Sequence, residues 1–583
     1  MNTYKILLAL FIIQISWSQK KDEDLGTEVV NVVKPYTATL SDAFKIKETP
    51  VLEDQENSKK EEIKYNIFSF PVASTFAPAK GKAAALDKEE KPRLYSNYAT
   101  LGGGNYGRLI AELFVTQTLD NNDYIGVMLR HNSSQGGIKN IYLDDKFSNT
   151  KIDATYGSTS KELNWNADIG FQHQLYNWYG LPSFFNEFTE IDRNIELSTI
   201  NPSHQYKNAY FGGKLELKES VFSNASLLFN RFWDNYNSAE NNLIVNPEIK
   251  FEINDWNIQS QFIVNYLSGK FARTYEVDTA INYNHIIFGV QPSFTYQKDD
   301  LSAQIGVGIF YHNDSENQKN KAYFYPQVTA SYKISGDQFI FYGGLQGGLS
   351  QNTYQNFVSQ NPFLSPTLMI TPTHNQLDAF AGIKGKLNNN MSYNVKANYL
   401  NEKNKPLFTY NSPFLVIANE EGYANGNSFG VLYDQVNTLS ISGEFNANLS
   451  PKVALGIQGV FNSYQTDVQE SAWNLPNFRF TTSLHAKITE KWSTALEIFL
   501  IGDRKDLVVE QSLLTIFPPQ FTRNEVTLKS YFDTNFSLYY KYNDRWSGFA
   551  KANNFLNQNY QLWYNYPVQT FQIVLGANYK FDF

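Results

Sequence analysis

Apolar and polar residues alternate with a period of two along most of the chain after Arg93. In the final segment, 571–583, the odd positions are apolar or aromatic and most even positions are polar. The same alternation recurs at 301–311, 391–399 and 439–447. Because successive side chains of a β-strand point to opposite faces, these segments are predicted to be strands with one apolar and one polar face. Such strands suit lipid on one side and water on the other, although a soluble sandwich also alternates.

Strand and connection lengths favour a membrane barrel over a sandwich. The segments run for about 11 to 16 residues, whereas sandwich strands usually have about 3–10 and a tilted bilayer crossing needs at least about 9–11. Short connections alternate with long ones, which is typical of outer-membrane barrels with short periplasmic turns and long extracellular loops. Short connections include 388–389, 449–451 and 489–490, and long ones include 177–205, 351–375, 402–435 and 504–525.

The alternation of short and long connections also predicts the number of strands. Counting back from a periplasmic Phe583 to Arg93 gives 22 strands, an even number that returns the N-terminus to the periplasm. The segment 280–297 is the difficult one, because its apolar phase shifts between Tyr283 and Ile286. We interpret it as one strand with a bulge, since two strands would break the alternation of turns. The predicted fold class is therefore an all-β transmembrane antiparallel barrel of about 22 strands, spanning residues 93–583.

Composition excludes several other classes of protein. Aromatic residues make up 16% of the chain and charged residues only 18%, which is the reverse of a disordered chain. The net charge of −8 leaves no electrostatic footprint for nucleic acid. Cysteine is absent, which excludes disulfides, thiolate metal sites and lipidation on cysteine.

The N-terminal residues 1–18 are predicted to be a signal peptide. Lys5 precedes an apolar run at 6–15, and Ser18 provides a small residue at the expected cleavage point. The run is too short to span a bilayer as a helix. Residues 19–92 are rich in charge and are predicted to form a mostly disordered, polar periplasmic tail. Localisation in the outer membrane follows from export combined with the predicted barrel.

The C-terminal residues resemble the last hairpin of TonB-dependent receptors. The resemblance rests on the Asn-Asn-Phe-Leu-Asn segment at 553–557, on Tyr566-Pro567, and on a final strand that closes on aromatic residues. It implies an outer-membrane barrel of that family, surrounded by outer-membrane lipid. It also implies that the outer-membrane insertion machinery recognises the terminal aromatic residues Tyr579, Phe581 and Phe583.

A second, shorter segment resembles a TonB box, the extended stretch that adds a strand to TonB. Its residues are Glu28, Val29, Val30, Asn31, Val32 and Val33. β-Branched residues in a flexible tail can pair with an exposed sheet edge, so the resemblance implies TonB as a partner. An ordinary apolar patch of a linker, or a remnant of a plug strand, remains the alternative interpretation.

The chain departs from the receptor family in its plug. The residues before Arg93 are fewer and more polar than the folded plug domain of those receptors, so the plug is predicted to be missing or strongly reduced. A barrel of about 22 strands has a wide lumen. The tail, inward-folded loops or a partner must therefore fill it.

No catalytic, cofactor-binding or metal site is predicted, and we expect no enzyme. The seven histidines lack metal-ligand spacing, and His131 and His312 are interpreted as rim residues at outer strand ends. Asp120–Asp123 resembles part of a calcium loop but lacks its Gly and distal Glu, and is interpreted as a periplasmic turn. The aromatic pairs Trp178-Tyr179, Phe184-Phe185 and Trp563-Tyr564 could stack on ligand rings, but membrane-interface girdles are the preferred interpretation.

Three functions remain open. The first is a barrel similar to TonB-dependent receptors that imports or binds an unidentified nutrient. The second is a structural or accessory subunit of an outer-membrane assembly or secretion complex, with a surface lipoprotein or other complex subunits as partners. The third is a passive pore. A pore needs an open lumen, an importer needs a gated one, and a subunit needs an exposed surface for a partner.

Overall fold

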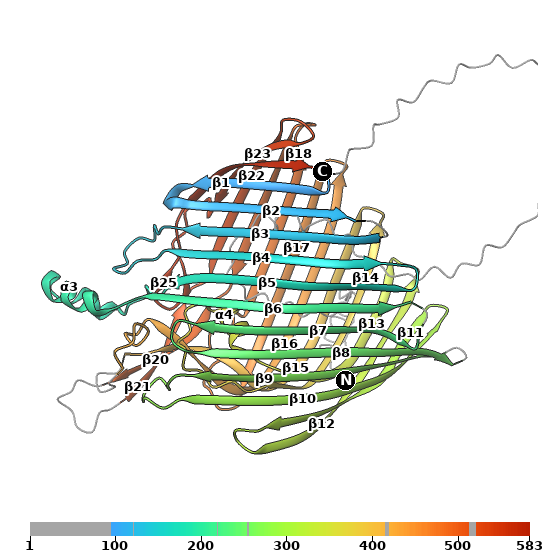
Figure 1. Cartoon of the computed structure of the whole chain (residues 1–583), viewed down its shortest axis with the longest axis horizontal. Coiled ribbons are helices and arrows are strands. Elements are labelled where there is room, and N and C mark those ends of the chain that lie inside the picture. Colours follow the sequence, from blue (N-terminus) through green and yellow to red (C-terminus); the bar gives the residue numbers. More distant parts are fainter. Residues whose placement is uncertain (1–94, 120–121, 219, 254–255, 414–418, 512–520) are drawn as a thin grey trace, which may run out of the picture. The chain divides into compact units, whose positions relative to one another are not determined.

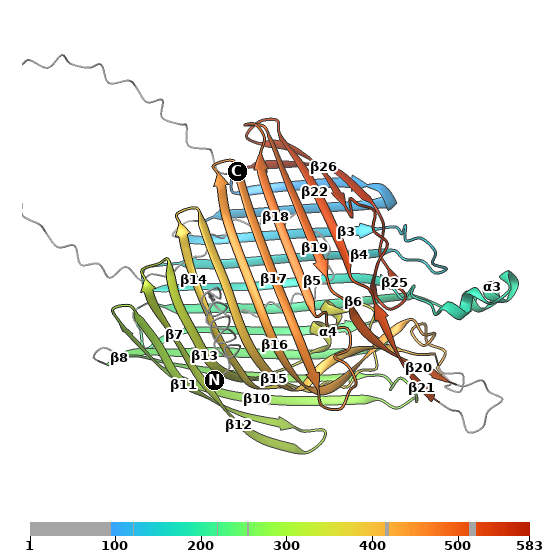
Figure 2. The same cartoon turned by 180° about the vertical axis from the view of Figure 1, so that it is seen from behind.

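The first and last strands of the barrel pair with each other. The computed structural model describes residues 95–119, 122–218, 220–253, 256–413, 419–511 and 521–583. Within them, 22 strands form one antiparallel sheet, in which β1 (Asn97–Gly104) pairs with both β2 and β26 (Gln572–Phe581). The sheet therefore closes into a barrel, seen from opposite sides in Figure 1 and Figure 2. The predicted fold class and the predicted 22 strands are confirmed.

The remaining barrel strands follow one another around the ring in chain order. They are β2 (Arg108–Thr118), β3 (Asp123–Ser134), β4 (Phe147–Thr159), β5 (Leu163–Asn177), β6 (Ser203–Leu217), β7 (Phe222–Asp234), β8 (Ala239–Ile253), β9 (Trp256–Phe271), β10 (Ile281–Lys298), β11 (Leu301–Asp314), β12 (Lys319–Ser335), β13 (Phe339–Ser350), β14 (Thr373–Asn388), β15 (Met391–Asn411), β16 (Ser428–Ser450), β17 (Val453–Thr466), β18 (Phe478–Lys487), β19 (Trp492–Ile501), β22 (Tyr531–Lys541) and β23 (Trp546–Asn553).

The elements outside the barrel sheet lie in its connections. Two small hairpins are formed by β20 (Arg504–Gln511) with β21 (Phe521–Leu528), and by β24 (Gln561–Trp563) with β25 (Tyr566–Pro567). The helical elements are η1 (Asn105–Gly107), η3 (Ser183–Asn186), α3 (Glu190–Thr199) and α4 (Tyr354–Gln360). No helix in the described ranges is both long and apolar enough to cross a membrane.

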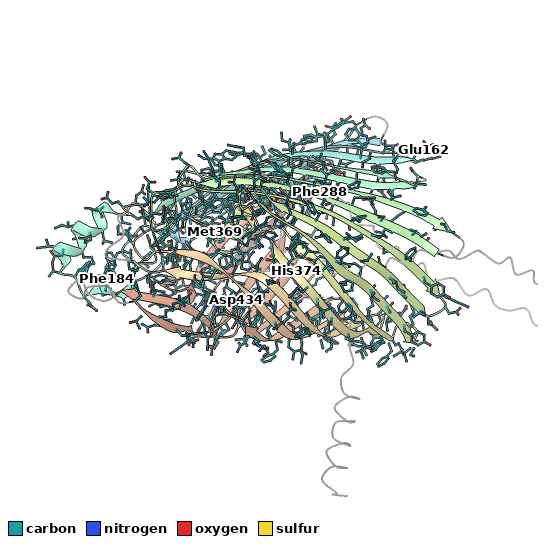
Figure 3. The ribbon with its side chains drawn as sticks, turned by 90° about the horizontal axis from the view of Figure 1, so that it is seen from below. Glu162, Phe184, Phe288, Met369, His374 and Asp434 are labelled. Atoms are coloured by element: carbon teal, nitrogen blue, oxygen red, sulfur yellow. The ribbon has the colours of Figure 1, made fainter. Side chains whose placement is uncertain are left out.

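The two ends of the barrel differ in the length of their connections. One end, here called the short-turn end, carries brief turns such as 160–162 and 389–390. The other, the long-loop end, carries the connections 178–202, 351–372 and 502–530. Figure 3 shows side chains crowded at the end near Phe184, with the strands diverging toward the end near Glu162. Most non-strand residues of the barrel are therefore gathered at the long-loop end.

The two faces of the wall match the alternation in the sequence. Ile305 and Leu575 are 55% and 59% exposed on the outer face. Their polar neighbours point inward, where Gln304 donates to the Ser293 hydroxyl of the preceding strand β10 and the Asn578 amide donates to the Thr100 hydroxyl at 2.7 Å. The outer wall is consequently apolar, and the inner wall is a polar, cross-strand hydrogen-bonded surface.

The segment 280–297 forms a single strand, as predicted, but the predicted bulge is wrong. β10 pairs with β9 in unbroken register from Ile281↔Phe271 to Thr295↔Asn257. The apolar phase shifts because the inner face of β10 is itself apolar near the long-loop end, where Tyr283 and Ile287 are buried. Buried neighbours inside the barrel, rather than an extra residue in the strand, explain the pattern.

The seam between β1 and β26 requires glycine at its last pair. A Cβ atom on Gly104 would lie 2.1 Å from the Ile573 carbonyl oxygen, so no larger residue fits without a backbone shift. The Asn105 side chain also bridges the seam, since its amide donates to the Phe571 carbonyl and its oxygen accepts from Ile573 N–H. The junction is thus closely packed at the long-loop end.

Several sequence predictions concern residues outside the described ranges. These are the signal peptide at 1–18, the polar tail at 19–92 with its TonB-box-like segment Glu28–Val33, and the Asp120-Asn121 part of the predicted turn. They stay predictions.

Candidate functional site

The connection 351–372, here called the inner loop, lies inside the barrel. It joins β13 to β14, yet the Tyr354 hydroxyl donates to Asp234 Oδ2 on β7 at 2.9 Å, and Pro362 O accepts from the Tyr206 hydroxyl on β6 at 2.8 Å. β8 to β12 separate β7 from β13 around the ring. Because both wall residues face inward, a loop that bonds them must cross the bore.

One buried carboxylate holds the start of α4. Glu240 Oε2, on β8, accepts from Tyr354 N–H at 2.7 Å and from the Tyr283 hydroxyl at 2.9 Å, while Oε1 accepts from Gln355 N–H at 3.3 Å. The first N–H groups of a helix have no partner within the helix and carry partial positive charge. Glu240 satisfies two of these donors and therefore anchors the helix to the wall.

A second buried carboxylate, Asp234, links three parts of the chain. Its Oδ1 accepts from Tyr236 N–H at 2.8 Å and Ser238 N–H at 3.0 Å, which shapes the tight β7–β8 turn. Its Oδ2 accepts from the Tyr354 hydroxyl and lies 3.4 Å from His204 Nε2 on β6. Asp234 thus ties the inner loop to two adjacent strands.

The far end of the inner loop is bonded to two further parts of the wall, one near β8 and one far around the ring. His285 Nε2, on β10, donates to Ile370 O at 2.9 Å, and the ring's Nδ1 lies 3.2 Å from His312 Nε2 on β11. On β16, the Tyr433 hydroxyl donates to Met369 O at 2.9 Å. The inner loop is therefore bonded to wall strands on both sides of the bore.

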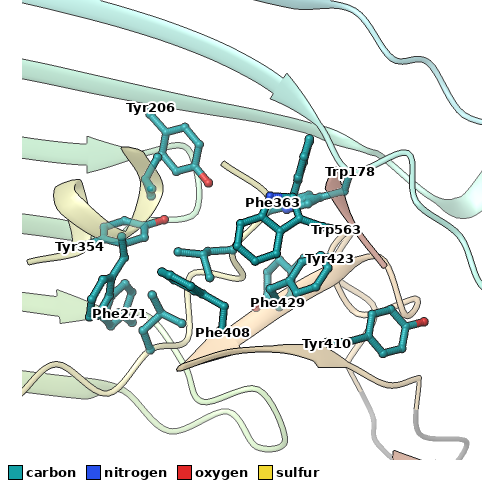
Figure 4. Packing of buried hydrophobic residues seen from close by; sticks show 14 of the residues in the cluster. Trp178, Tyr206, Phe271, Tyr354, Phe363, Phe408, Tyr410, Tyr423, Phe429 and Trp563 are labelled. Carbon is teal, nitrogen blue, oxygen red and sulfur yellow. The ribbon is translucent and has the colours of Figure 1, made fainter. Parts of the chain in front are cut away.

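The inner loop also packs in a cluster of buried, mainly aromatic residues, here called the mouth core (Figure 4). Its centre is the Phe363–Tyr566 stack at 3.9 Å, which joins the inner loop to the β24–β25 hairpin. Tyr179, from the β5–β6 connection, packs on Tyr566 at 4.7 Å. The buried members are Trp178, Tyr179, Tyr206, Phe232, Leu267, Phe271, Tyr283, Tyr354, Phe357, Val358, Phe363, Leu364, Leu368, Ile370, Phe408, Tyr410, Tyr423, Phe429, Val508, Trp563 and Tyr566.

The β20–β21 hairpin is tied to the mouth core by a buried carboxylate. The Asp506 side chain is fully buried, and its Oδ1 accepts from Tyr410 N–H at 3.1 Å and Leu507 N–H at 2.8 Å. Burial raises the pKa of this carboxyl to about 6. Arg504 donates to Gln561 O at 2.7 Å, which connects the hairpin to β24. At the long-loop end, several connections thus pack on one another across the bore.

The preferred interpretation of the aromatic pairs is wrong for most of their members. Trp178, Tyr179, Phe185 and Trp563 are buried, not placed in a girdle at a membrane interface. Trp178, Tyr179 and Trp563 are buried in the mouth core, because the connections that carry them fold over the bore, whereas Phe185 packs on Phe184 and Phe188. For the inner loop itself the sequence carries a signal of burial, since this long connection has no charged residue.

The remaining candidate residues lie apart from one another. His131 Nδ1 bonds the Thr150 hydroxyl at 2.7 Å on β4, whereas His312 is buried inside the barrel beside His285. His312 does lie near the outer end of its strand, as the sequence suggested, but its side chain is buried instead of exposed at the rim. In the described part of the chain, no three His, Asp or Glu residues gather in a metal-binding arrangement.

The three terminal aromatic residues form a row on β26 and the tail that follows it. The Tyr579 ring packs on Trp546 at 4.6 Å and on Phe581 at 5.8 Å, and Phe583 is 82% exposed. Their predicted recognition by the insertion machinery is not tested by this arrangement and stays a prediction.

Comparisons with known proteins find similarity in structure but not in sequence. No family model matches the chain, and no curated protein sequence gives a significant match. P. aeruginosa FpvA bound to a heterologous pyoverdine superposes with a TM-score of 0.60 at 12% identity, covering 84% of this chain and 72% of that one. The ferric-catecholate import receptor Fiu of E. coli K12 gives 0.58 at 11%, covering 84% and 82%. The FrpB iron transporter of Neisseria meningitidis gives 0.61 at 10%, covering 85% and 82%.

These neighbours share the fold of the chain. They are TonB-dependent receptors with a 22-strand barrel, which matches the resemblance of the C-terminal residues. At such low identity, the similarity is one of architecture. Together with the apolar outer wall, it places the barrel in the outer membrane. The short-turn end then faces the periplasm and the long-loop end faces the exterior.

Proposed function

We propose that the protein is a gated outer-membrane barrel that binds or imports an unidentified nutrient, with the inner loop as its gate. The observation that carries this proposal is the packing of the barrel's own loops across the bore at the extracellular end, in the mouth core, which we take to close the bore. A nutrient that enters from outside meets this closure first. A passive pore would need an open path at the same place, so the closure counts against that function.

The anchoring of the inner loop supports a gate more than a permanent filler. The loop ends are held to the wall by hydrogen bonds to a few buried side chains, chiefly Glu240, Asp234 and His285. A hydrogen bond in a water-poor site contributes modestly to stability when made, but a buried group left without its partner costs about 1–3 kcal/mol. Such contacts favour two discrete states of the loop, docked and released.

Energised opening would come from the periplasmic side. The TonB-box-like segment Glu28–Val33 is the candidate for strand addition to TonB. Proline fixes φ and lacks the N–H donor that strand pairing uses. Val30→Pro with Val32→Pro should therefore abolish crosslinking to TonB while the barrel still assembles. Unchanged crosslinking would remove TonB from the proposal.

Conductance tests the gate directly. In planar bilayers, the full chain should show a small or closed conductance, and replacing residues 354–370 by a short Gly-Ser linker should raise it. Deleting residues 19–92 measures any contribution of the tail to closure. A large, steady conductance of the unmodified chain would overturn the gate and favour the passive pore.

The second candidate function is a structural or accessory subunit of an outer-membrane complex. One observation favours it, namely that α3 presents exposed isoleucines outside the barrel. Crosslinking to TonB supports the importer. A barrel that never contacts TonB but is always recovered with the same outer-membrane protein would support the subunit.

A further inference from the structure

The connection between β5 and β6 carries a helical arm that takes no part in closing the bore. Its helix, α3, has no buried residue, and Figure 1 and Figure 2 both show it extending beyond the strands at the long-loop end. A helix of ten residues is marginal on its own in water. An arm of this kind is stabilised either by contacts at its base or by something that covers its exposed face.

The base of the arm is held firmly. The Arg193 guanidinium stacks over the Tyr142 ring at 4.7 Å and reaches the carbonyl oxygens of Phe185 and Phe188, both at 3.5 Å. The Tyr142 hydroxyl donates to Asn186 Oδ1 at 2.7 Å. These contacts connect the arm to the neighbouring β3–β4 connection, so the helix is presented in one orientation.

The face of α3 opposite this base is apolar and exposed. Ile191 and Ile195 are 74% and 58% exposed, and their i, i+4 spacing places them side by side. Arg193 and Leu197, also four residues apart, lie on the other side of an ideal helix, facing the base. The two isoleucines therefore form a stripe that nothing in the described chain covers.

Carboxylates lie along one side of this stripe. At 100° per residue, Asp192 lies about 60° beyond Ile195 around the helix and Glu196 about 40° further on, whereas Glu190 lies on the base side, about 20° from Leu197. Glu187 adds a fourth carboxylate, whereas Arg193 is the only basic residue of 187–199 and is already engaged at the base. The arm thus combines an apolar stripe with an acidic flank, here called the acidic rim.

We propose that α3 docks into an apolar groove of a partner protein whose rim carries lysine or arginine. Binding of an amphipathic helix in a groove is a common mode of recognition, in which apolar residues at i and i+4 anchor the helix. The acidic rim selects a basic partner and steers its approach. A second copy of the arm is disfavoured, because two acidic rims would repel each other. The inference holds whether or not the barrel imports a nutrient.

Photo-crosslinking in intact cells tests this docking in the full chain. A photoreactive amino acid replaces Ile195, and the same residue placed at Val468, which is 76% exposed on another extracellular connection, is the matched control. We expect one discrete protein adduct from position 195 and none from 468. The crosslinked peptide of the partner should carry apolar residues flanked by lysine or arginine.

Charge reversal provides the decisive comparison. Asp192→Lys with Glu196→Lys should lower the adduct yield about tenfold, and so should a rise in salt that screens the rim. Glu470→Lys, an exposed carboxylate elsewhere at the same end, should leave the yield unchanged. Unchanged heat-modifiable migration shows that each variant still folds.

Four results would overturn the proposal. They are no adduct from position 195, an adduct with lipid, an adduct between two copies of this chain, and a yield that is indifferent to charge reversal. Because none of these readouts involves TonB or conductance, failure here is distinguishable from failure of the gate.

Discussion

Individual side chains show which face of the wall meets lipid. Ile305 on β11 is exposed outside, and Gln304, one residue earlier, bonds a neighbouring strand inside. A charged side chain costs much more free energy on the outer face than on the inner face, because lipid cannot solvate a charge and the polar inner wall can. The period-two alternation thus reflects the two environments of the wall, lipid outside and a polar protein surface inside.

Arginine at these two positions should separate the faces. Ile305→Arg should destabilise the barrel by about 2–4 kcal/mol if the site is near the bilayer midplane, whereas Gln304→Arg should cost much less because its side chain points inward. Unfolding by urea in lipid vesicles, followed by heat-modifiable migration, measures both. Equal losses at both positions would contradict the assignment of the faces.

A second residue leads us to expect that the extracellular hairpin is sensitive to pH. Burial raises the pKa of Asp506 to about 6, above its ordinary 3.8. The folded form therefore binds the proton more tightly than the unfolded form does, so stability falls as pH rises from about 4 to about 6. Two pKa units correspond to roughly 2–3 kcal/mol.

We therefore expect slower hydrogen exchange of the β20–β21 hairpin at pH 5 than at pH 7.5, after correction for the intrinsic rate. Asp506→Asn should remove this difference and slow exchange at pH 7.5, because the amide oxygen can still accept from Tyr410 and Leu507. Glu525→Gln should leave the difference in place, since hydrogen bonding by Lys505 lowers the pKa of Glu525 instead of raising it. A pH-independent hairpin in the unmodified chain would refute this prediction.

Among the elements, α4 depends on the wall more than on its own sequence. It has seven residues, too few to be stable as an isolated helix. Its start is capped by the Thr353 hydroxyl, which accepts from Asn356 N–H at 3.0 Å, and by Glu240 across the bore. Phe357 and Val358 are buried in the mouth core. The helix therefore exists as part of the docked inner loop.

Replacing Glu240 should release this element while the barrel remains. Glu240→Leu leaves the N–H groups of Tyr354 and Gln355 and the Tyr283 hydroxyl without an acceptor, each at a cost of about 1–3 kcal/mol. Glu240→Gln keeps one acceptor oxygen and should have a smaller effect. Protease cleavage within 351–372 on intact cells measures release, with heat-modifiable migration as the folding control. Protection of the loop in Glu240→Leu would show that the aromatic contacts alone hold it.

At the scale of the whole molecule, the closed ring distinguishes a barrel from an open sheet. The seam pairs Thr100 with Asn578 and Gly104 with Val574. Since the chain has no cysteine, an engineered pair reports the seam without background. Closure also removes both sheet edges, which otherwise expose unpaired backbone groups to lipid.

Thr100→Cys with Asn578→Cys should form a disulfide across the seam upon mild oxidation. The covalent ring should then keep a compact migration after boiling without reductant and lose it with reductant. Thr100→Cys with Val574→Cys, displaced by four residues along β26, should stay reduced. Free thiols in the first pair would mean that β1 and β26 are not neighbours.

The strands were predictable because their pattern is local. Each residue of β11 or β26 is apolar or polar according to the face on which it lies, and that face follows from its position in the strand. The alternation of short and long connections, together with the even number of strands that it requires, then implies 22 strands in a closed barrel. The bulge predicted at 280–297 failed because Tyr283 and Ile287 face other protein groups inside the bore, which a lipid-or-water interpretation does not consider.

The sequence by itself determined the wall of the barrel, its two faces and its two ends, since these depend on spacing along the chain. Only the tertiary structure decided how the bore is closed. The Tyr179 hydroxyl donates to Pro567 O across 388 positions, and Tyr206 reaches Pro362 across 156. Such contacts form only after the ring has brought distant connections together over one opening. Aromatic residues in a loop carry no periodicity that says whether they face lipid, a ligand or one another, so their burial is a property of the closed barrel.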